Sequence, residues 1–167
     1  MGMRDLGSLD PTGFWNHSTA SGISDAGQVV GLAYTAEGTA HAFITGPNGV
    51  GMTDLGTLGG DSSFASGIND AGQVVGRSHT TAGGFAHAFI TGRNGDGIMD
   101  LNSLVDMPDG VVLIAATGIN DAGQVIAEGY ASIIPEPEVY ALFLAGLALV
   151  GFIARRKKIS AAAFSLR

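Results

Sequence analysis

The hydrophobic residues of this chain occur in short β-branched runs separated by turn residues. The run Gln73–Ser78 follows residues 69–72, Asn-Asp-Ala-Gly, which favour a type I turn with glycine in the left-handed position. Residues 85–91 form a second run, which ends at the turn residues 93–97. Residues 47–49, Pro-Asn-Gly, occupy the corresponding place earlier in the chain. This pattern predicts units of about four strands joined by hairpins.

Three sequence elements recur and define these units. Gly-Ile-Ser/Asn-Asp-Ala-Gly-Gln-Val begins at Gly22, Gly67 and Gly118, with offsets of 45 and 51 residues. His-Ala-Phe-Ile-Thr-Gly begins at His41 and His87. The third element, which contains Asp-Leu, occupies residues 4–9, 53–58 and 99–104. Interleaved repeats at matching spacing indicate a repeat architecture, because one such sheet cannot bury its own faces.

The period and the strand count predict an all-β, propeller-like but incomplete fold. We place the repeats at about residues 3–50, 51–97 and 98–130 within a body spanning residues 1–130. The third repeat is degenerate, since no His-Ala-Phe follows residue 126. The body is therefore an open stack, an arc completed by another chain, or the C-terminal part of a longer array.

The C-terminal region has a different pattern. A linker at residues 131–138 precedes residues 139–154, which carry no charge. Sixteen residues span about 24 Å as a helix, so we expect a transmembrane helix here, with a buried helix as the alternative. Four basic residues follow as a membrane stop: Arg155, Arg156, Lys157 and Lys158. The positive-inside rule predicts that the tail, residues 155–167, is cytoplasmic and the repeats lie outside.

Charge and composition narrow the function classes. Residues 1–138 contain fifteen acidic and three basic side chains, a net charge of −12, so we expect no nucleic-acid partner. The chain contains no cysteine, which excludes disulfides and thiolate sites. No apolar run of signal-peptide length lies at the N-terminus, so we expect the natural start to lie upstream of Met1.

Candidate chemistry in the repeats is sparse. His41 and His87 recur, and we expect strand histidines bonded to the backbone, with metal binding as the alternative. One aspartate occurs in each hairpin turn and suits the turn itself, although a row of them could bind calcium or sugar hydroxyls: Asp25, Asp70 and Asp121. The residues Asp61, Ser62, Ser63 and His79 have no nucleophile–base spacing. We therefore predict no catalytic, cofactor-binding or metal site and no enzyme activity.

Two stretches resemble known families. The runs 54–60, 67–76 and 87–89 resemble the HAF repeat, a bacterial extracellular repeat, over about residues 3–129, which implies an exported β-rich protein. The order Pro135-Glu136-Pro137, apolar stretch, basic cluster resembles the PEP-CTERM sorting signal. That resemblance implies recognition of Pro135, Glu136 and Pro137 by exosortase, an integral-membrane protease, with the membrane and exopolysaccharide as further partners.

These features together predict an exported repeat protein, anchored at its C-terminus in the inner membrane and then released to the cell surface or matrix. A carbohydrate- or calcium-binding module is one alternative. A propeller hydrolase or lyase is a second, although its polar residues should then differ between repeats. A permanent single-pass membrane protein is a third.

Overall fold

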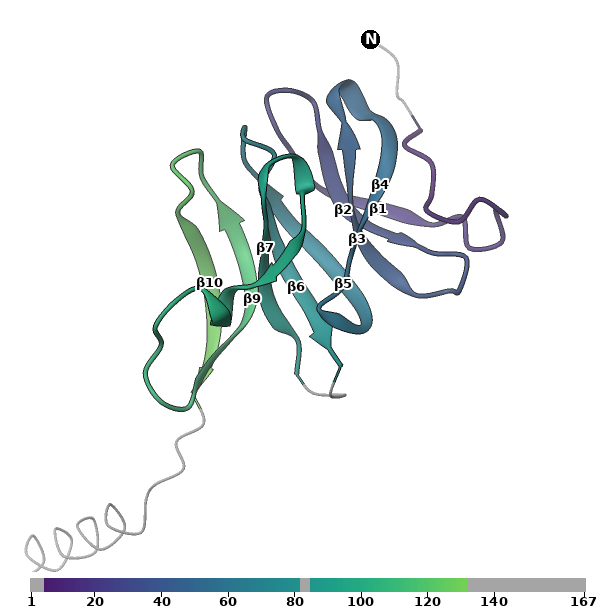
Figure 1. Ribbon diagram of the computed structural model, residues 1–167. Coiled ribbons are helices and arrows are strands. Elements are labelled where there is room, and N and C mark those ends of the chain that lie inside the picture. The colour runs from purple at the N-terminus through teal and green to yellow at the C-terminus, as the bar shows by residue number, and fades with distance from the viewer. Residues whose placement is uncertain (1–4, 82–84, 132–167) are drawn as a thin grey trace, which may run out of the picture. The chain divides into compact units, whose positions relative to one another are not determined.

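The computed structural model describes residues 5–81 and 85–131, which fold into β-sheets (Figure 1). The first sheet contains β1 (Ser18–Ile23), β2 (Val29–Tyr34), β3 (Ala40–Gly46) and β4 (Val50–Gly56). The second sheet contains β5 (Gly59–Ile68), β6 (Val74–Thr80), β7 (His87–Thr91) and β8 (Ile98–Asp100). The third contains β9 (Val111–Ile119) and β10 (Val125–Ala131). Three 3-10 turns connect strands: η1 (Pro47–Gly49), η2 (Arg93–Gly95) and η3 (Leu101–Ser103).

The strands of each sheet follow one another in sequence order and pair antiparallel. The sheets also lie side by side in sequence order, with the second between the first and the third (Figure 1). Sequential antiparallel pairing needs only short connections, and the turn residues supply them. The repeated sequence thus becomes a stack of sheets in which each repeat contacts the next.

The hairpin turns between the first two strands have the backbone that the sequence predicts. Gly27, Gly72 and Gly123 adopt φ values of 73°, 72° and 76°, and each donates its N–H to the carbonyl three residues earlier. Only glycine adopts this left-handed region without steric cost. The two strands predicted after Gly72 are confirmed, since β6 and β7 coincide with most of the two predicted runs.

The turns η1 and η2 bind to these hairpin turns within their own sheets. The Gly49 N–H donates to the carbonyl of Gly27 at 2.9 Å, and Gly95 does the same to Gly72 at 2.9 Å. The connection between the third and fourth strands is therefore held to the connection between the first and second. This explains why a Pro/Arg-Asn-Gly turn recurs at nearly the same distance, 22 and 23 residues, after Asp-Ala-Gly.

Two apolar clusters lie between neighbouring sheets. The cluster between the first and second sheets joins buried residues of both: Val30, Ala42, Ile44, Leu55, Ala65, Val74 and Phe89. The cluster between the second and third sheets contains fewer buried residues: Val75, Ala88, Leu101 and Ala116. Because each cluster takes side chains from two sheets, burial of apolar surface is what holds the stack together.

Buried threonines complete the interior. Thr45 and Thr91 are fully enclosed, and their hydroxyl groups accept the backbone N–H of Val29 and Val74 at 2.8 and 2.9 Å. A buried hydroxyl without a partner would destabilise the fold, so these bonds explain how threonine is accommodated there. The same bond in both repeats fixes the register of the third strand against the second.

The all-β part of the predicted fold class is confirmed, the propeller-like arrangement is not, and the predicted transmembrane helix needs correction. The described residues form three separate antiparallel sheets, and the third has two strands because its sequence lacks the His-Ala-Phe element. Among the described residues, none of the helical segments has the length and apolar character needed to cross a membrane. The expected transmembrane helix at residues 139–154 is not seen, and that stretch lies outside the described residues.

Candidate functional site

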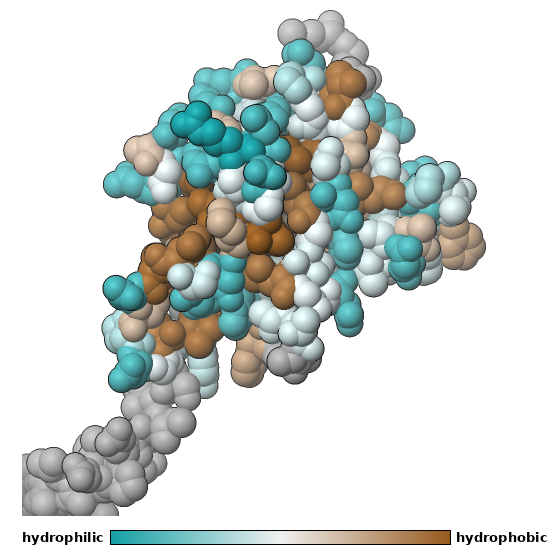
Figure 2. Space-filling view, in the orientation of Figure 1, coloured by the Kyte–Doolittle hydropathy of each residue, from teal (hydrophilic) through white to brown (hydrophobic). Residues whose placement is uncertain are grey.

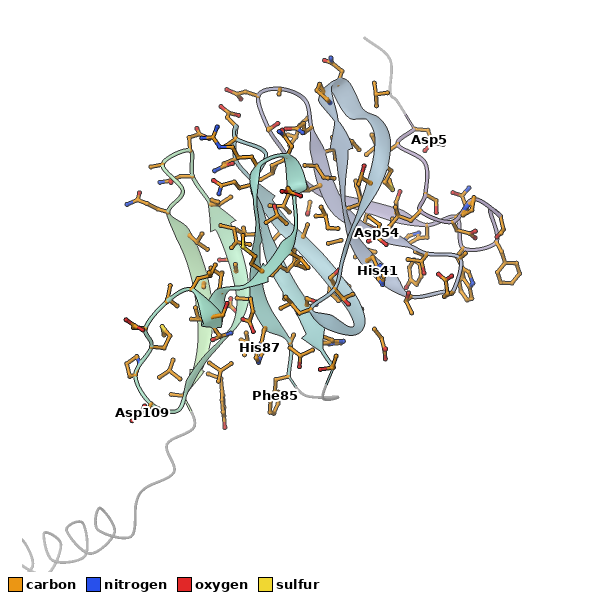
Figure 3. All side chains as sticks on the ribbon, viewed as in Figure 1. Asp5, His41, Asp54, Phe85, His87 and Asp109 are labelled. Atoms are coloured by element: carbon orange, nitrogen blue, oxygen red, sulfur yellow. The ribbon has the colours of Figure 1, made fainter. Side chains whose placement is uncertain are left out.

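Each of the first two sheets carries a histidine–aspartate pair at its outer edge. Nδ1 of His41 lies 2.8 Å from Oδ2 of Asp54, and Nδ1 of His87 lies 2.6 Å from Oδ2 of Asp100. His41 and Asp54 are labelled next to each other in Figure 3. The pairs arise because the third and fourth strands pair in equivalent registers, Phe43 opposite Asp54 and Phe89 opposite Asp100. The expectation that these histidines bond to the backbone is therefore wrong.

A backbone hydrogen bond holds each carboxylate in place. Oδ1 of Asp54 accepts the N–H of Gly56 at 2.7 Å, and Oδ1 of Asp100 accepts the N–H of Asn102 at 2.9 Å. Asp5, which occupies the same place in the repeated sequence, likewise accepts from the residue two positions on. These backbone hydrogen bonds orient the carboxylates independently of the histidines.

In the pair of His87 and Asp100, the pKa of the aspartate is shifted. Partial burial raises the pKa of Asp100, but hydrogen bonds from His87 and Asn102 together outweigh it and hold the pKa below its ordinary value of 3.8. An ionised carboxylate can only accept hydrogen bonds, so Nδ1 of His87 carries the proton. In the neutral ring Nε2 is then an acceptor.

A cavity of about 390 Å³ opens beside His87. It is lined by His87, Asn102, the connection at residues 105–110 and the first two residues of β9. The acidic residues Asp106 and Asp109 belong to this lining. The cavity therefore lies between the imidazole ring of His87 and this connection. The same histidine–aspartate pair also occurs at His41, so the pair is a property of the repeat and not of the cavity.

Other predicted candidates have mixed outcomes. The spacing of Ser62 and His79 along the chain predicted no nucleophile–base pair. In the structure Oγ of Ser62 lies 2.9 Å from Nδ1 of His79. The pairing of β5 with β6, which sets Ser63 opposite Ser78, brings them there. Such a contact depends on strand register, which the spacing of the two residues along the chain does not reveal. Neither residue lines the cavity beside His87.

The turn aspartates form one continuous row across the sheets. The backbone N–H of Asp25 donates to Oδ1 of Asp70 at 2.9 Å, and the N–H of Asp70 donates to Oδ1 of Asp121 at 2.9 Å. Turn chemistry alone therefore does not account for Asp70 and Asp121, because each of these two carboxylates also joins two repeats. We call this row the aspartate ladder. Within residues 5–81 and 85–131, three or more metal-ligating side chains nowhere gather closely enough to hold an ion.

The residues predicted to direct sorting lie outside the described part of the chain: Pro135, Glu136, Pro137, Arg155, Arg156, Lys157 and Lys158. Their sequence nevertheless shows how the protein is sorted. Residues 134–158 match the PEP-CTERM protein-sorting motif. Comparison with curated proteins and with solved structures gave no match.

The PEP-CTERM motif is a signal for export and membrane-associated sorting to the cell surface, and exosortase, a membrane protease, recognises it. The motif supports an exported surface protein that exosortase processes. The individual roles of Pro135, Glu136 and Pro137 stay predictions, as do those of the basic residues 155–158. The match covers the end of the chain and leaves the repeats to be interpreted from their structure.

Proposed function

We propose that this chain is a HAF-type repeat protein of the cell surface or extracellular matrix, where the stacked sheets act as a structural or adhesive scaffold. The observation that carries the proposal is the PEP-CTERM motif at residues 134–158. The HAF resemblance of the repeats, an extracellular repeat by its family, agrees with export.

The scaffold role, as opposed to an enzymatic one, is supported by the equivalence of the repeats. His41 with Asp54 and His87 with Asp100 form the same pair at closely similar distances. In a repeat protein with an active site, the catalytic side chains usually occur in one repeat and are absent from the others, because activity depends on specific residues and not on the fold. A contact that recurs in the first two sheets is instead expected to stabilise those sheets.

The sorting part of the proposal is tested by intact mass. The full chain, preceded by a signal peptide, is produced in one host with exosortase and in an otherwise identical host without it. We expect loss of the segment beginning near Pro137 in the first host alone. An unchanged mass in both hosts would overturn processing.

Matched variants show whether the motif is responsible. Replacing Pro135, Glu136 and Pro137 together by alanine should abolish the mass change. Pro108→Ala, which alters a proline in the connection before β9, should leave it intact. Cleavage of the triple variant at the same bond would show that these three residues are not the recognition element.

Exopolysaccharide is the partner that we propose for the released body. The support is its predicted place in the matrix together with the glycine-rich and acidic composition of residues 1–138. Cosedimentation of the purified chain with exopolysaccharide from an exosortase-bearing bacterium tests this. Recovery of the chain in the supernatant at every polysaccharide concentration would contradict it.

A further inference from the structure

One repeat position changes from buried to exposed along the stack. Val30, Val75 and Ile126 are the same position in the three hairpins. Val30 and Val75 are 0% exposed, because the second sheet covers the first and the third covers the second. Ile126 is 70% exposed. Figure 2 shows apolar surface over the end of the stack where β9 and β10 lie.

At the opposite end of the stack, another repeat position is exposed in the first sheet and packed in the second and third. Ile68 and Ile119 pack against the clusters between sheets, Ile68 on the side of the first sheet and Ile119 on the side of the second. The equivalent residue of the first sheet, Ile23, is 69% exposed. The two ends therefore expose the two halves of one packing arrangement that the chain forms twice internally, with Val30 and Ile68 in one cluster and Val75 and Ile119 in the other.

The backbone at the two ends is complementary as well. A Cβ added at Gly22 would lie 3.6 Å from the Cα of Gly67, and one added at Gly67 would lie 3.5 Å from the Cα of Gly118. Among the described residues, a Cβ added at Gly118 would meet only Ile126, at 4.0 Å. The close approach of glycine to glycine thus continues to the surface of the third sheet, where no described residue takes the place that the next glycine would occupy.

The aspartate ladder ends in the same complementary way. Asp70 and Asp121 each accept the turn N–H of the preceding repeat, whereas the carboxylate of Asp25 accepts no hydrogen bond from a described residue. The last turn, at Asp121, presents the N–H that would continue the row. One end therefore offers a donor and the other an acceptor.

We propose that the face of the third sheet around Ile126 binds the face of the first sheet around Ile23 of a second copy of this chain, head to tail. The occupant is a second copy because the contact would continue an interface already formed twice inside the molecule, through the same apolar, glycine and aspartate positions. Head-to-tail contacts use two different surfaces, so they can propagate beyond a dimer. The proposal does not depend on the sorting function.

Sedimentation equilibrium of the full chain over a range of concentrations tests the proposal. A mild detergent, present throughout, prevents association through the apolar residues 139–154. The unmodified chain should show masses above that of the monomer, and Ile126→Glu and Ile23→Glu should each sediment as monomers. Val50→Glu, which changes another exposed apolar residue on β4, should associate as the unmodified chain does.

Mixing the two variants gives the sharpest result. Ile126→Glu keeps an intact first-sheet face and Ile23→Glu keeps an intact third-sheet face, so an equimolar mixture should form a dimer that grows no further. An unmodified chain that stays monomeric, variants that still associate, or a mixture that stays monomeric would each overturn the proposal. If near-UV circular dichroism shows that a glutamate variant is unfolded, Ile23→Ser and Ile126→Ser replace the pair.

Discussion

The backbone N–H of Asp70 donates a hydrogen bond of 2.9 Å to Oδ1 of Asp121, although 51 residues separate them. The same bond, also 2.9 Å long, joins Asp25 to Asp70 across 45 residues. Each turn aspartate after the first therefore serves two repeats, its own hairpin and the one before. This arrangement makes the turns part of the interface between sheets.

Asp70→Ala should destabilise the fold by about 1 kcal/mol more than Asp25→Ala. Both substitutions have the same local effect on a hairpin turn, but only Asp70 accepts a hydrogen bond from another sheet. Urea denaturation of the dilute chain gives both free energies of unfolding, and equal losses would show that the bond between the repeats contributes nothing.

Gly72→Ala should cost more stability than Gly123→Ala. Both glycines have a left-handed φ, so alanine costs about 1 kcal/mol at either position. A Cβ at Gly72 would also lie 2.8 Å from backbone atoms of Asn94, whereas at Gly123 the nearest atom is Oε1 of Gln73 at 4.0 Å. We expect at least a further 1 kcal/mol for Gly72→Ala, measured by thermal or urea unfolding. A larger loss at Gly123 would contradict this account.

Asp100→Asn should reduce stability at neutral pH and have little effect in acid. Because the pKa of Asp100 lies below its unfolded value of 3.8, the ionised carboxylate stabilises the native state above that pH. This stability is lost as the pH falls through the native pKa. The pair with His87 is partly exposed, so the neutral-pH effect should be about 0.5–1 kcal/mol.

Urea titrations of the unmodified chain and of Asp100→Asn, at neutral pH and below pH 3.8, measure the difference. Asp109→Asn, in the loop beside the same cavity, is the control and should show no comparable dependence. A difference between the two chains that stays constant over this pH range would rule out the carboxylate as its origin.

The fluorescence of Trp15 should report the state of Asp10. The hydroxyl of Thr12 and the N–H of Trp15 donate hydrogen bonds to this carboxylate at 2.6 and 2.7 Å, and these bonds lower its pKa below 3.8. They hold the loop in which Trp15 stacks on Tyr34, with ring centroids 6.0 Å apart.

Asp10→Ala should therefore shift the emission of Trp15, the single tryptophan of the chain, to longer wavelength at neutral pH. The unmodified chain should show the same shift only as the pH falls below 3.8, when Asp10 becomes protonated. Asp61→Ala, an exposed aspartate on β5, serves as the control. Identical spectra for all three chains would show that the loop does not depend on Asp10.

Sequence patterns identified local structure well where a single hairpin decides it. The left-handed position of Gly72 and the strands around it follow from Asn-Asp-Ala-Gly, because this conformation depends only on adjacent residues. The partner of His41 could not be predicted in this way. Its contact with Asp54 requires the register of two paired strands, and a shift of one residue would turn the side chain to the other face.

The sequence by itself determined the repeats, the turns and the PEP-CTERM motif at residues 134–158, since each is a property of consecutive residues or of their recurrence. Only the tertiary structure decided which repeat residues are buried. Val75 and Ile126 occupy one repeat position, yet the first is enclosed and the second exposed, because burial depends on whether another sheet covers that face. The same physical reason makes Ile126 and Ile23 the places at which a second copy would bind.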